Sequence, residues 1–379
     1  MTVPEGWESP PDRTRQLDET DVWPASSRSL PPVPPPPPPP TPVAPSPPVA
    51  PPAPVAPPTP VAPPAPVPEP LPGPVPTGTD RLLTEPVPPA IGLPVQGVAE
   101  VVGRRAVNAY VEITVHAPDI ADAAEPGQFV AFAVGGATSA MLLRRSLAIA
   151  GVQDGRVSVV VSARGPGSTW LAGLRPGDEV DVIGPLGRPF PPAPRGVPAL
   201  LVGGGYGAAA LVGLAGRLRA AGHEVAAVAG AASADRLCSL PELARLVAPL
   251  AVLTDDGSAG RRGQVTLAVE ELVGGAGIVY ACGPMGMLRA VSDLAAARGV
   301  PAYVAVEESM ACGIGVCMTC VLPVVGADGR TRFARSCTEG PVFGGDRVRF
   351  DDVGTLPADV VGADAMGLVL APAAVEVTA

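Results

Sequence analysis

The sequence lacks the features of nucleic-acid-binding and disulfide-rich proteins. Only two of its 379 residues are histidine, and 36 Asp and Glu against 26 Lys and Arg give a net charge of −10. Nucleic-acid binding needs a basic face, so this acidic composition argues against that class. Six cysteines are too few for a disulfide scaffold in a chain of this length.

Export and membrane signals are missing as well. Residues 1–20 are polar and contain acids, without the apolar stretch of a secretory signal. Residues 196–216 carry no charge, but seven of these 21 residues are glycine, and the order of apolar run, glycine cluster and Ala/Leu run is typical of a strand, a tight loop and a helix. We therefore expect a cytoplasmic protein without a membrane segment, whose clustered cysteines stay reduced.

Proline is abundant and concentrated near one end. About half of the 53 prolines lie in residues 31–77, in an imperfect Pro-Val-Ala-Pro-Pro repeat. Because proline has no amide donor and a fixed φ, residues 1–97 are predicted to be a disordered tail, either a spacer or a ligand for a proline-binding partner. The small apolar residues 351–379 are predicted to form a C-terminal tail.

Between the tails the hydrophobic pattern changes twice. In residues 98–195, apolar segments alternate with period two between Gly and Pro, which predicts a small antiparallel β-barrel. In residues 196–305, short apolar strands alternate with helical segments, which predicts a parallel-sheet α/β domain. Residues 306–350 are predicted to form a small β-rich module that holds most of the cysteines. The fold class is therefore multi-domain α+β.

The strongest motif is the cysteine cluster, formed by Cys312, Cys317, Cys320 and Cys337. The Cys-x4-Cys-x2-Cys spacing with a distant fourth cysteine is that of plant-type [2Fe–2S] sites. Gly313 and Gly315 allow positive φ and a close approach of backbone amides to sulfur. Structural zinc sites usually show two short cysteine pairs instead, so zinc and unligated thiols remain the weaker alternatives.

Two glycine-containing loops follow apolar strands in the α/β region. The first carries Gly203, Gly204, Gly205 and Gly207, and the second carries Cys282, Gly283 and Pro284. A glycine loop between a strand and a helix can hold a pyrophosphate with its backbone amides, although a tight turn that only packs is the alternative. The second loop is expected at the same carboxyl edge of the sheet, where open α/β folds bind ligands. No acidic residue follows at the Rossmann position, which indicates another nucleotide fold.

The barrel region contains two further candidate features. Arg144 and Arg145 interrupt an otherwise apolar segment, and an arginine there can hold a phosphate, unless the pair is only exposed at the barrel rim. Gly165, Gly167 and Ser168 lie in a loop at the end of a predicted strand.

Together these segments resemble the electron-transfer subunit of NAD-dependent (class 1B) dihydroorotate dehydrogenases, within the ferredoxin–NADP reductase group. The resemblance covers about residues 98–350. The flavin motif Arg-Pro-x-Ser corresponds to Arg145, Ser146, Leu147 and Ala148, so that the hydroxyl of the last position is absent here. Tyr206 and Ala210 are departures within the first glycine loop, whereas the four cysteines and the segment Thr254–Ser258 match the family pattern.

The resemblance implies three cofactors and a partner. It implies FAD in the barrel, NAD in the α/β domain and a [2Fe–2S] cluster on the four cysteines. In the family, dihydroorotate is oxidised on a separate FMN-containing subunit, and electrons pass through the cluster and FAD to NAD in pyrimidine biosynthesis. We therefore expect an oxidoreductase subunit in a heterotetramer.

Two other functions remain open from the sequence. The chain could be a related reductase subunit for another acceptor, of the ferredoxin transhydrogenase or sulfide dehydrogenase type. It could also be a zinc-stabilised, non-catalytic binding module. For the nucleotide, NAD is expected rather than NADP, because the strand that ends at 230–233 lacks an arginine and Arg236 is the nearest cation.

Overall fold

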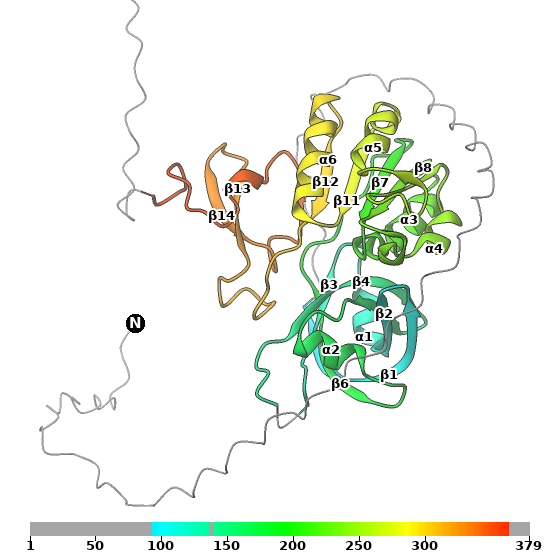
Figure 1. Ribbon diagram of the computed structural model, residues 1–379. Coiled ribbons are helices and arrows are strands. Elements are labelled where there is room, and N and C mark those ends of the chain that lie inside the picture. The colour runs from blue at the N-terminus through cyan, green and yellow to red at the C-terminus, as the bar shows by residue number, and fades with distance from the viewer. Residues whose placement is uncertain (1–92, 137–138, 364–379) are drawn as a thin grey trace, which may run out of the picture. The chain divides into compact units, whose positions relative to one another are not determined.

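The computed structural model describes residues 93–136 and 139–363. Nearly all of the predicted proline-rich tail, and the last part of the C-terminal tail, lie outside the described residues. The described part contains a closed barrel, a seven-stranded sheet with helices on both faces and a two-stranded hairpin (Figure 1). These elements confirm the predicted fold class. None of the helices in the described ranges is long and apolar enough to cross a membrane.

The barrel closes through six antiparallel strands in the order β1-β2-β5-β4-β3-β6. The strands are β1 (Val95–Val107), β2 (Tyr110–His116), β3 (Phe129–Phe132), β4 (Arg145–Gln153), β5 (Arg156–Val161) and β6 (Glu179–Leu186), with the short helices α1 (Pro118–Ala123) and α2 (Pro166–Ala172) between them. β1 begins three residues before the predicted boundary at residue 98. The alternation of apolar and polar residues along β1 is weak, because few of its side chains are buried.

Alternate side chains of these strands fill the barrel. Ile113, Val159 and Val182 are fully or almost fully buried in one apolar cluster inside it. Each such side chain contributes about 1.5–3 kcal/mol of transfer free energy when it leaves water. On the other face of β2 and β5, the hydroxyl groups of Thr114 and Ser158 lie 2.9 Å apart and share a hydrogen bond. The period-two pattern of the sequence therefore corresponds to inside and outside of the barrel.

The second domain is a sheet in the order β10-β9-β8-β7-β11-β12-β15. Its strands are β7 (Ala199–Gly204), β8 (Val225–Ala231), β9 (Leu250–Thr254), β10 (Arg261–Arg262), β11 (Ile278–Cys282), β12 (Ala302–Ala305) and β15 (Val342–Gly344). Its helices are α3 (Gly207–Ala220), α4 (Leu240–Ala244), α5 (Thr266–Leu272) and α6 (Met285–Ala297), with short 3-10 turns at Ala234–Arg236 and Val273–Gly275. All neighbouring strands are parallel except β12 and β15.

Helices cover both faces of this sheet (Figure 1). The apolar side chains of α3 and α4 pack in one cluster, and those of α5 and α6 pack in another. Because the middle strands are buried on both sides, they read as continuous apolar runs. The chain leaves β7 toward β8 on one side and returns to β11 on the other, so a crevice forms at the carboxyl ends of β7 and β11.

The cysteine-bearing module is held by the sheet at both of its ends. The chain leaves β12, forms the cysteine loop and the hairpin of β13 (Val321–Val325) and β14 (Thr331–Arg335), and returns as β15, which pairs antiparallel with β12. Residues 342–344, predicted as part of the module, therefore complete the large sheet.

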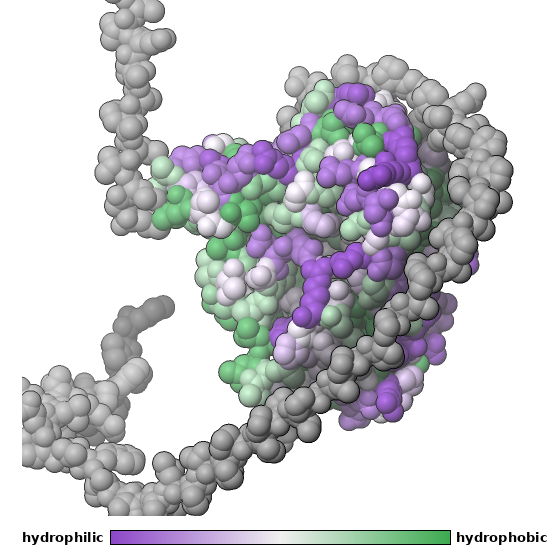
Figure 2. Space-filling model, viewed as in Figure 1, coloured by the Kyte–Doolittle hydropathy of each residue, from purple (hydrophilic) through white to green (hydrophobic). Residues whose placement is uncertain are grey.

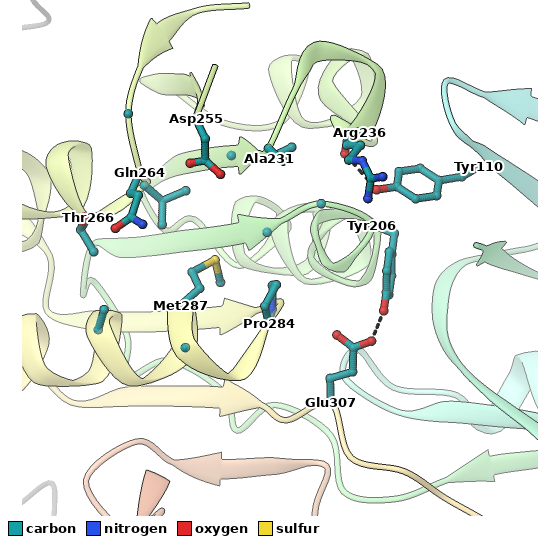
Figure 3. Close-up of a pocket in the computed structure, with 18 of the residues that line it drawn as sticks. Tyr110, Tyr206, Ala231, Arg236, Asp255, Gln264, Thr266, Pro284, Met287 and Glu307 are labelled. Atoms are coloured by element: carbon teal, nitrogen blue, oxygen red, sulfur yellow. Dashed lines mark hydrogen bonds between the residues drawn. The ribbon is translucent and has the colours of Figure 1, made fainter. Parts of the chain in front are cut away.

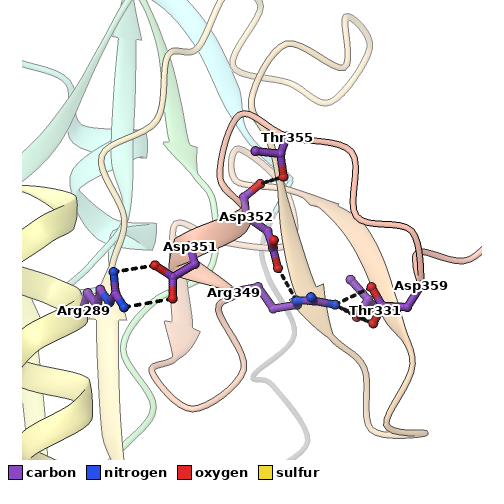
Figure 4. A network of polar contacts seen from close by, with 7 residues as sticks. All are labelled: Arg289, Thr331, Arg349, Asp351, Asp352, Thr355 and Asp359. Atoms are coloured by element: carbon purple, nitrogen blue, oxygen red, sulfur yellow. Dashed lines mark hydrogen bonds and ion pairs between the residues drawn. The ribbon is translucent and has the colours of Figure 1, made fainter. Parts of the chain in front are cut away.

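The segment after residue 350 is held by ion pairs (Figure 4). Arg349 contacts Asp359 at 2.5 Å and Asp352 at 2.6 Å, and it donates a 2.7 Å hydrogen bond to the hydroxyl of Thr331. These bonds from Arg349 and Thr331 hold the pKa of Asp359 below its ordinary value. Val360 is buried beside them. Residues 351–363 thus pack on the module, although the small apolar sequence gives no sign of it.

Candidate functional site

A cavity of about 400 Å³ opens at the crevice of the sheet. Its lining comes from the carboxyl ends of β7, β8 and β11, from the loops after β9 and from two barrel residues (Figure 3). Among the residues predicted from sequence, Gly204, Gly205 and Pro284 line it. The structure therefore brings parts of both predicted loops to one cavity, as expected for loops at one edge of a parallel sheet.

The two glycine loops lie directly against each other. A Cβ added to Gly207 would lie 2.5 Å from the carbonyl oxygen of Cys282, and one added to Gly204 would lie 2.8 Å from Cδ of Pro284. A Cβ on Gly203 would collide with Ala208 at 2.7 Å. These three glycines are thus required for packing. Gly205 differs, because it has a φ of +55° and its added Cβ would have no neighbour closer than 3.4 Å.

Aromatic and charged side chains line the end of the cavity nearest the barrel. The ring of Tyr206 meets the ring of Tyr110 edge-on at 5.6 Å, and the guanidinium of Arg164 lies 5.6 Å from its centre. The Tyr206 hydroxyl hydrogen-bonds to Glu307 (Figure 3). Burial and this bond raise the pKa of the Tyr206 hydroxyl, so it stays protonated. Burial also raises the pKa of the Cys282 thiol to about 12.

The two arginines of the barrel have different surroundings. Arg144 contacts Asp181 at 2.7 Å. Burial raises the pKa of Asp181, but hydrogen bonds from Arg144 and Gln96 outweigh it and lower the pKa overall. Arg145 forms no ion pair with any residue that the structure describes, and its guanidinium donates to the carbonyl of Leu143 at 2.7 Å. Arg145 is therefore a half-buried cation that has no carboxylate partner among the described residues.

Arg145 lies against the predicted glycine loop. A Cβ added to Gly167 would lie 2.5 Å from Nε of Arg145. The hydroxyl of Ser168 accepts hydrogen bonds from the amides of Arg164 and Gly165 at 3.0 and 3.1 Å, which fixes the loop where α2 begins. An unpaired guanidinium beside an ordered backbone loop suits a phosphate group. Ser146, Leu147 and Ala148 follow in β4, which pairs with β3.

The four cysteine thiols are free, and they approach each other as two pairs, Cys312 with Cys317 and Cys320 with Cys337. Cys320 and Cys337 are buried and hydrogen-bonded to each other. Cys317 is exposed, and hydrogen bonds from Thr319 and then from Cys312 lower its pKa to about 6. Among the described residues, no three His, Cys, Asp or Glu side chains meet as ligands of a single ion.

This donor set fits a two-iron cluster. A [2Fe–2S] cluster takes four thiolates, and two pairs of thiols match its two irons. Gly313 and Gly315 have φ values of +73° and +87°, and the amide of Ile314 donates to Sγ of Cys312 at 3.5 Å. Such amide contacts stabilise negative charge on sulfur.

The cysteine site lies against the barrel. Cys320 and Cys337 belong to one apolar cluster with Phe129 and Ala131 of β3. A Cβ added to Gly313 would lie 3.4 Å from the hydroxyl oxygen of Ser146 in β4. The predicted flavin strand and the predicted cluster loop are therefore in contact, although they are far apart in the sequence.

Sequence reasoning missed several cavity residues. Arg164, Asp255 and Glu307 line the cavity, and Arg236 lines it as well. In the sequence, Arg236 stands out only as the cation nearest to residues 230–233, and Asp255 only as part of a family signature. Glu307 follows an apolar strand and has no motif of its own, so only the folded chain reveals it.

Known proteins are similar to this chain over more than half of its length. The family of the iron–sulfur cluster binding domain of dihydroorotate dehydrogenase B matches residues 307–349. The electron transfer subunit of dihydroorotate dehydrogenase B (NAD(+)) from Geobacillus thermodenitrificans is 39% identical over 236 residues, which are 61% of this chain and 90% of that protein. The chain belongs to this family of electron transfer subunits.

Further relatives agree with this assignment. A probable electron transfer subunit of dihydroorotate dehydrogenase B from Methanopyrus kandleri is 38% identical over 240 residues, 63% of this chain and 86% of that protein. A solved structure of an NADH-dependent reduced ferredoxin–NADP oxidoreductase, reported in the context of flavin-based electron bifurcation, is also similar to this chain. Its sequence identity is 31% and its TM-score is 0.59, and the match covers 68% of this chain and 91% of that one. The chain is an electron-transfer oxidoreductase subunit, as predicted.

Proposed function

We propose that this electron transfer subunit connects an FMN-containing dihydroorotate dehydrogenase catalytic subunit with NAD, in a cytoplasmic heterotetramer of pyrimidine biosynthesis. The observation that carries this proposal is the contact of the cysteine loop with strand β4, at Gly313 and Ser146. It brings the proposed cluster ligands next to the proposed flavin strand. Electron transfer within one chain needs its two redox sites to lie close together, and this contact supports such proximity.

The barrel would hold FAD through Arg145 and the loop of Gly165, Gly167 and Ser168. Arg145 supplies an unpaired positive charge for the pyrophosphate, and Ser168 keeps the loop ordered. Backbone groups of Ser146, Leu147 and Ala148 would line the flavin. When bound, FAD exchanges electron pairs with nicotinamide and single electrons with an iron–sulfur cluster, so it suits the position between them.

The cavity would hold NAD. Gly204, Gly205 and Pro284 would line the nucleotide, and the close packing of Gly203, Gly207, Cys282 and Gly283 holds the two loops in place. Glu307 and Tyr206 orient each other at the end nearest the barrel, where nicotinamide would meet the flavin. The raised pKa of Cys282 keeps its thiol neutral beside the nucleotide.

The partner would dock over the cysteine loop. Ile314, Val316 and Met318 are 46%, 74% and 52% exposed between the cysteines, and Leu142 and Leu143 of the β3–β4 connection are 90% and 54% exposed. Figure 2 shows apolar surface in the area of both segments. Apolar residues gathered around a redox site favour an interface over solvent. Cys312, Cys317, Cys320 and Cys337 would hold the cluster beneath this surface.

The test is purification of the native complex followed by two assays. We expect an FMN-containing partner to co-purify, and the complex to reduce NAD⁺ with dihydroorotate as donor. The second candidate function is a transhydrogenase subunit, favoured by the 31% identical ferredoxin–NADP oxidoreductase. Co-purification with a different flavoprotein, and electron transfer from ferredoxin but not from dihydroorotate, would support that candidate and refute the proposal.

A further inference from the structure

Two buried hydroxyl groups in the described part of the chain lack a hydrogen-bond partner. They are Oγ of Ser336 and Oγ1 of Thr338. Leaving a buried hydroxyl unsatisfied costs about 1–3 kcal/mol, so such groups usually have a function or a missing partner. Other buried hydroxyls are bonded: Thr331 donates to Asp359, and Ser292 donates to the carbonyl of Leu288.

Both residues flank the ligand Cys337 in the sequence and contact the segment that carries the other cysteines. Ser336 is fully buried, and its backbone amide donates to the carbonyl of Cys320 at 2.9 Å. Thr338 packs on the cysteine loop, since a Cβ added to Gly315 would lie 2.7 Å from its methyl carbon and 3.5 Å from its hydroxyl oxygen. The two residues therefore lie beside Cys337, between the cysteine loop and the end of β14.

The charged groups nearby are already bonded to each other. Arg335 donates to the carbonyl of Gly315 at 3.1 Å and lies 3.5 Å from Glu339. Glu339 also accepts the amide of Arg335 at 2.6 Å. These bonds hold the cysteine loop against β14 and leave both hydroxyls without a partner among the described residues. Within the cysteine loop, the Thr319 side chain already hydrogen-bonds to Cys317.

We propose that Ser336 and Thr338 donate O–H···S hydrogen bonds to sulfur at the four-cysteine site and thereby set the reduction potential of its cluster. The proposal rests on the proposed function, because it requires a [2Fe–2S] cluster on these cysteines. Donors to sulfur stabilise added negative charge, so they favour the reduced state. Sulfur of the bound cluster supplies the acceptors that the two orphaned hydroxyls lack.

The experiment compares paired variants of the full chain. Ser336→Ala and Thr338→Val each remove one donor, and Thr338→Ser keeps it. The cluster potential is measured by redox titration followed by electron paramagnetic resonance. We expect each removal to lower the equilibrium constant for cluster reduction about tenfold, which is about 59 mV for a one-electron couple. Thr338→Ser should restore the original potential.

Controls separate this effect from a structural one. Thr355→Val makes the same change at an exposed hydroxyl that donates to the carbonyl of Asp352, and it should leave the potential unchanged. Exchangeable-proton couplings of the reduced cluster, compared in H₂O and D₂O, should weaken in Thr338→Val and persist in Thr338→Ser.

The outcomes distinguish two kinds of failure. An intact cluster with an unchanged potential and unchanged proton couplings in Ser336→Ala and Thr338→Val would overturn the hydrogen-bond proposal. A wild-type chain that binds no iron would overturn the proposed function instead. If Ser336→Ala loses its cluster, the comparison of Thr338→Val with Thr338→Ser decides the question by itself.

Discussion

Replacing Arg145 by alanine tests the flavin site most directly. Its guanidinium lies beside Gly167 and forms no ion pair with a described residue, so a phosphate would be its main charged partner. A hydrogen bond to a charged group contributes about 1.5–3 kcal/mol. At about 1.4 kcal/mol per tenfold in affinity, Arg145→Ala should weaken FAD binding roughly 10- to 100-fold.

The neighbouring arginine is a matched control. Arg144 has similar exposure in the same segment, but it is paired with Asp181 at 2.7 Å. Arg144→Ala should therefore leave the Kd for FAD within about twofold, and its cost should appear as a loss of stability of up to about 1 kcal/mol. The dissociation constants are measured by titrating the apoprotein with FAD and following flavin fluorescence.

A second variant changes Gly167, the loop residue that lies against Arg145. Gly167→Ala would place Cβ 2.5 Å from Nε of Arg145 and displace the guanidinium. We expect weaker FAD binding in this variant, and the double variant with Arg145→Ala should be no worse than Arg145→Ala alone, because both changes act on one contact. Equal FAD affinity in wild type and Arg145→Ala, or equal losses in Arg145→Ala and Arg144→Ala, would refute the reasoning.

Three further predictions follow from the other sites. Protein purified without oxygen should contain about two irons per chain. Cys337→Ser should lose the visible cluster spectrum. Cys238→Ser, which changes a buried cysteine outside the site, should keep it. Asp255 lines the cavity, so Asp255→Asn should raise kcat/KM for NADPH several-fold, because it removes the repulsion between the carboxylate and the phosphates of NADPH. An unchanged ratio of NADH to NADPH activity would exclude this role of Asp255. Ile314→Glu should keep FAD, iron and NADH–dye activity but abolish electron transfer to the partner subunit. The control Val152→Glu changes a side chain that is 44% exposed, against 46% for Ile314, and it should not affect this transfer. Electron transfer to the partner that survives in Ile314→Glu would place the docking surface elsewhere.

The electron-transfer family could be predicted from the sequence because its motifs are local. The Cys-x4-Cys-x2-Cys spacing places three thiolates on one short loop, whatever the rest of the chain does. The period-two segments of the barrel and the apolar runs of the sheet follow from one-sided and two-sided burial. These features depend on near neighbours in the chain, so the fold class and the kinds of site could be predicted.

Other features depend on contacts between distant residues. The sequence presents Arg144 and Arg145 as equals, and only the position of Asp181 in β6 makes one structural and leaves the other unpaired. Likewise, Glu307 is a cavity residue because the fold brings it to the glycine loops and to Tyr206, which lies 101 positions earlier.

The sequence by itself determined the kinds of site in this protein, because spacing, periodicity and glycine placement are properties of short segments. Tertiary structure decided how the sites are connected. Cys320 and Cys337 pack on Phe129, and Gly313 approaches Ser146, because the module is held between β12 and β15 and folds back over the barrel. Such proximity depends on the closure of long loops, and the local sequence carries no signal for it.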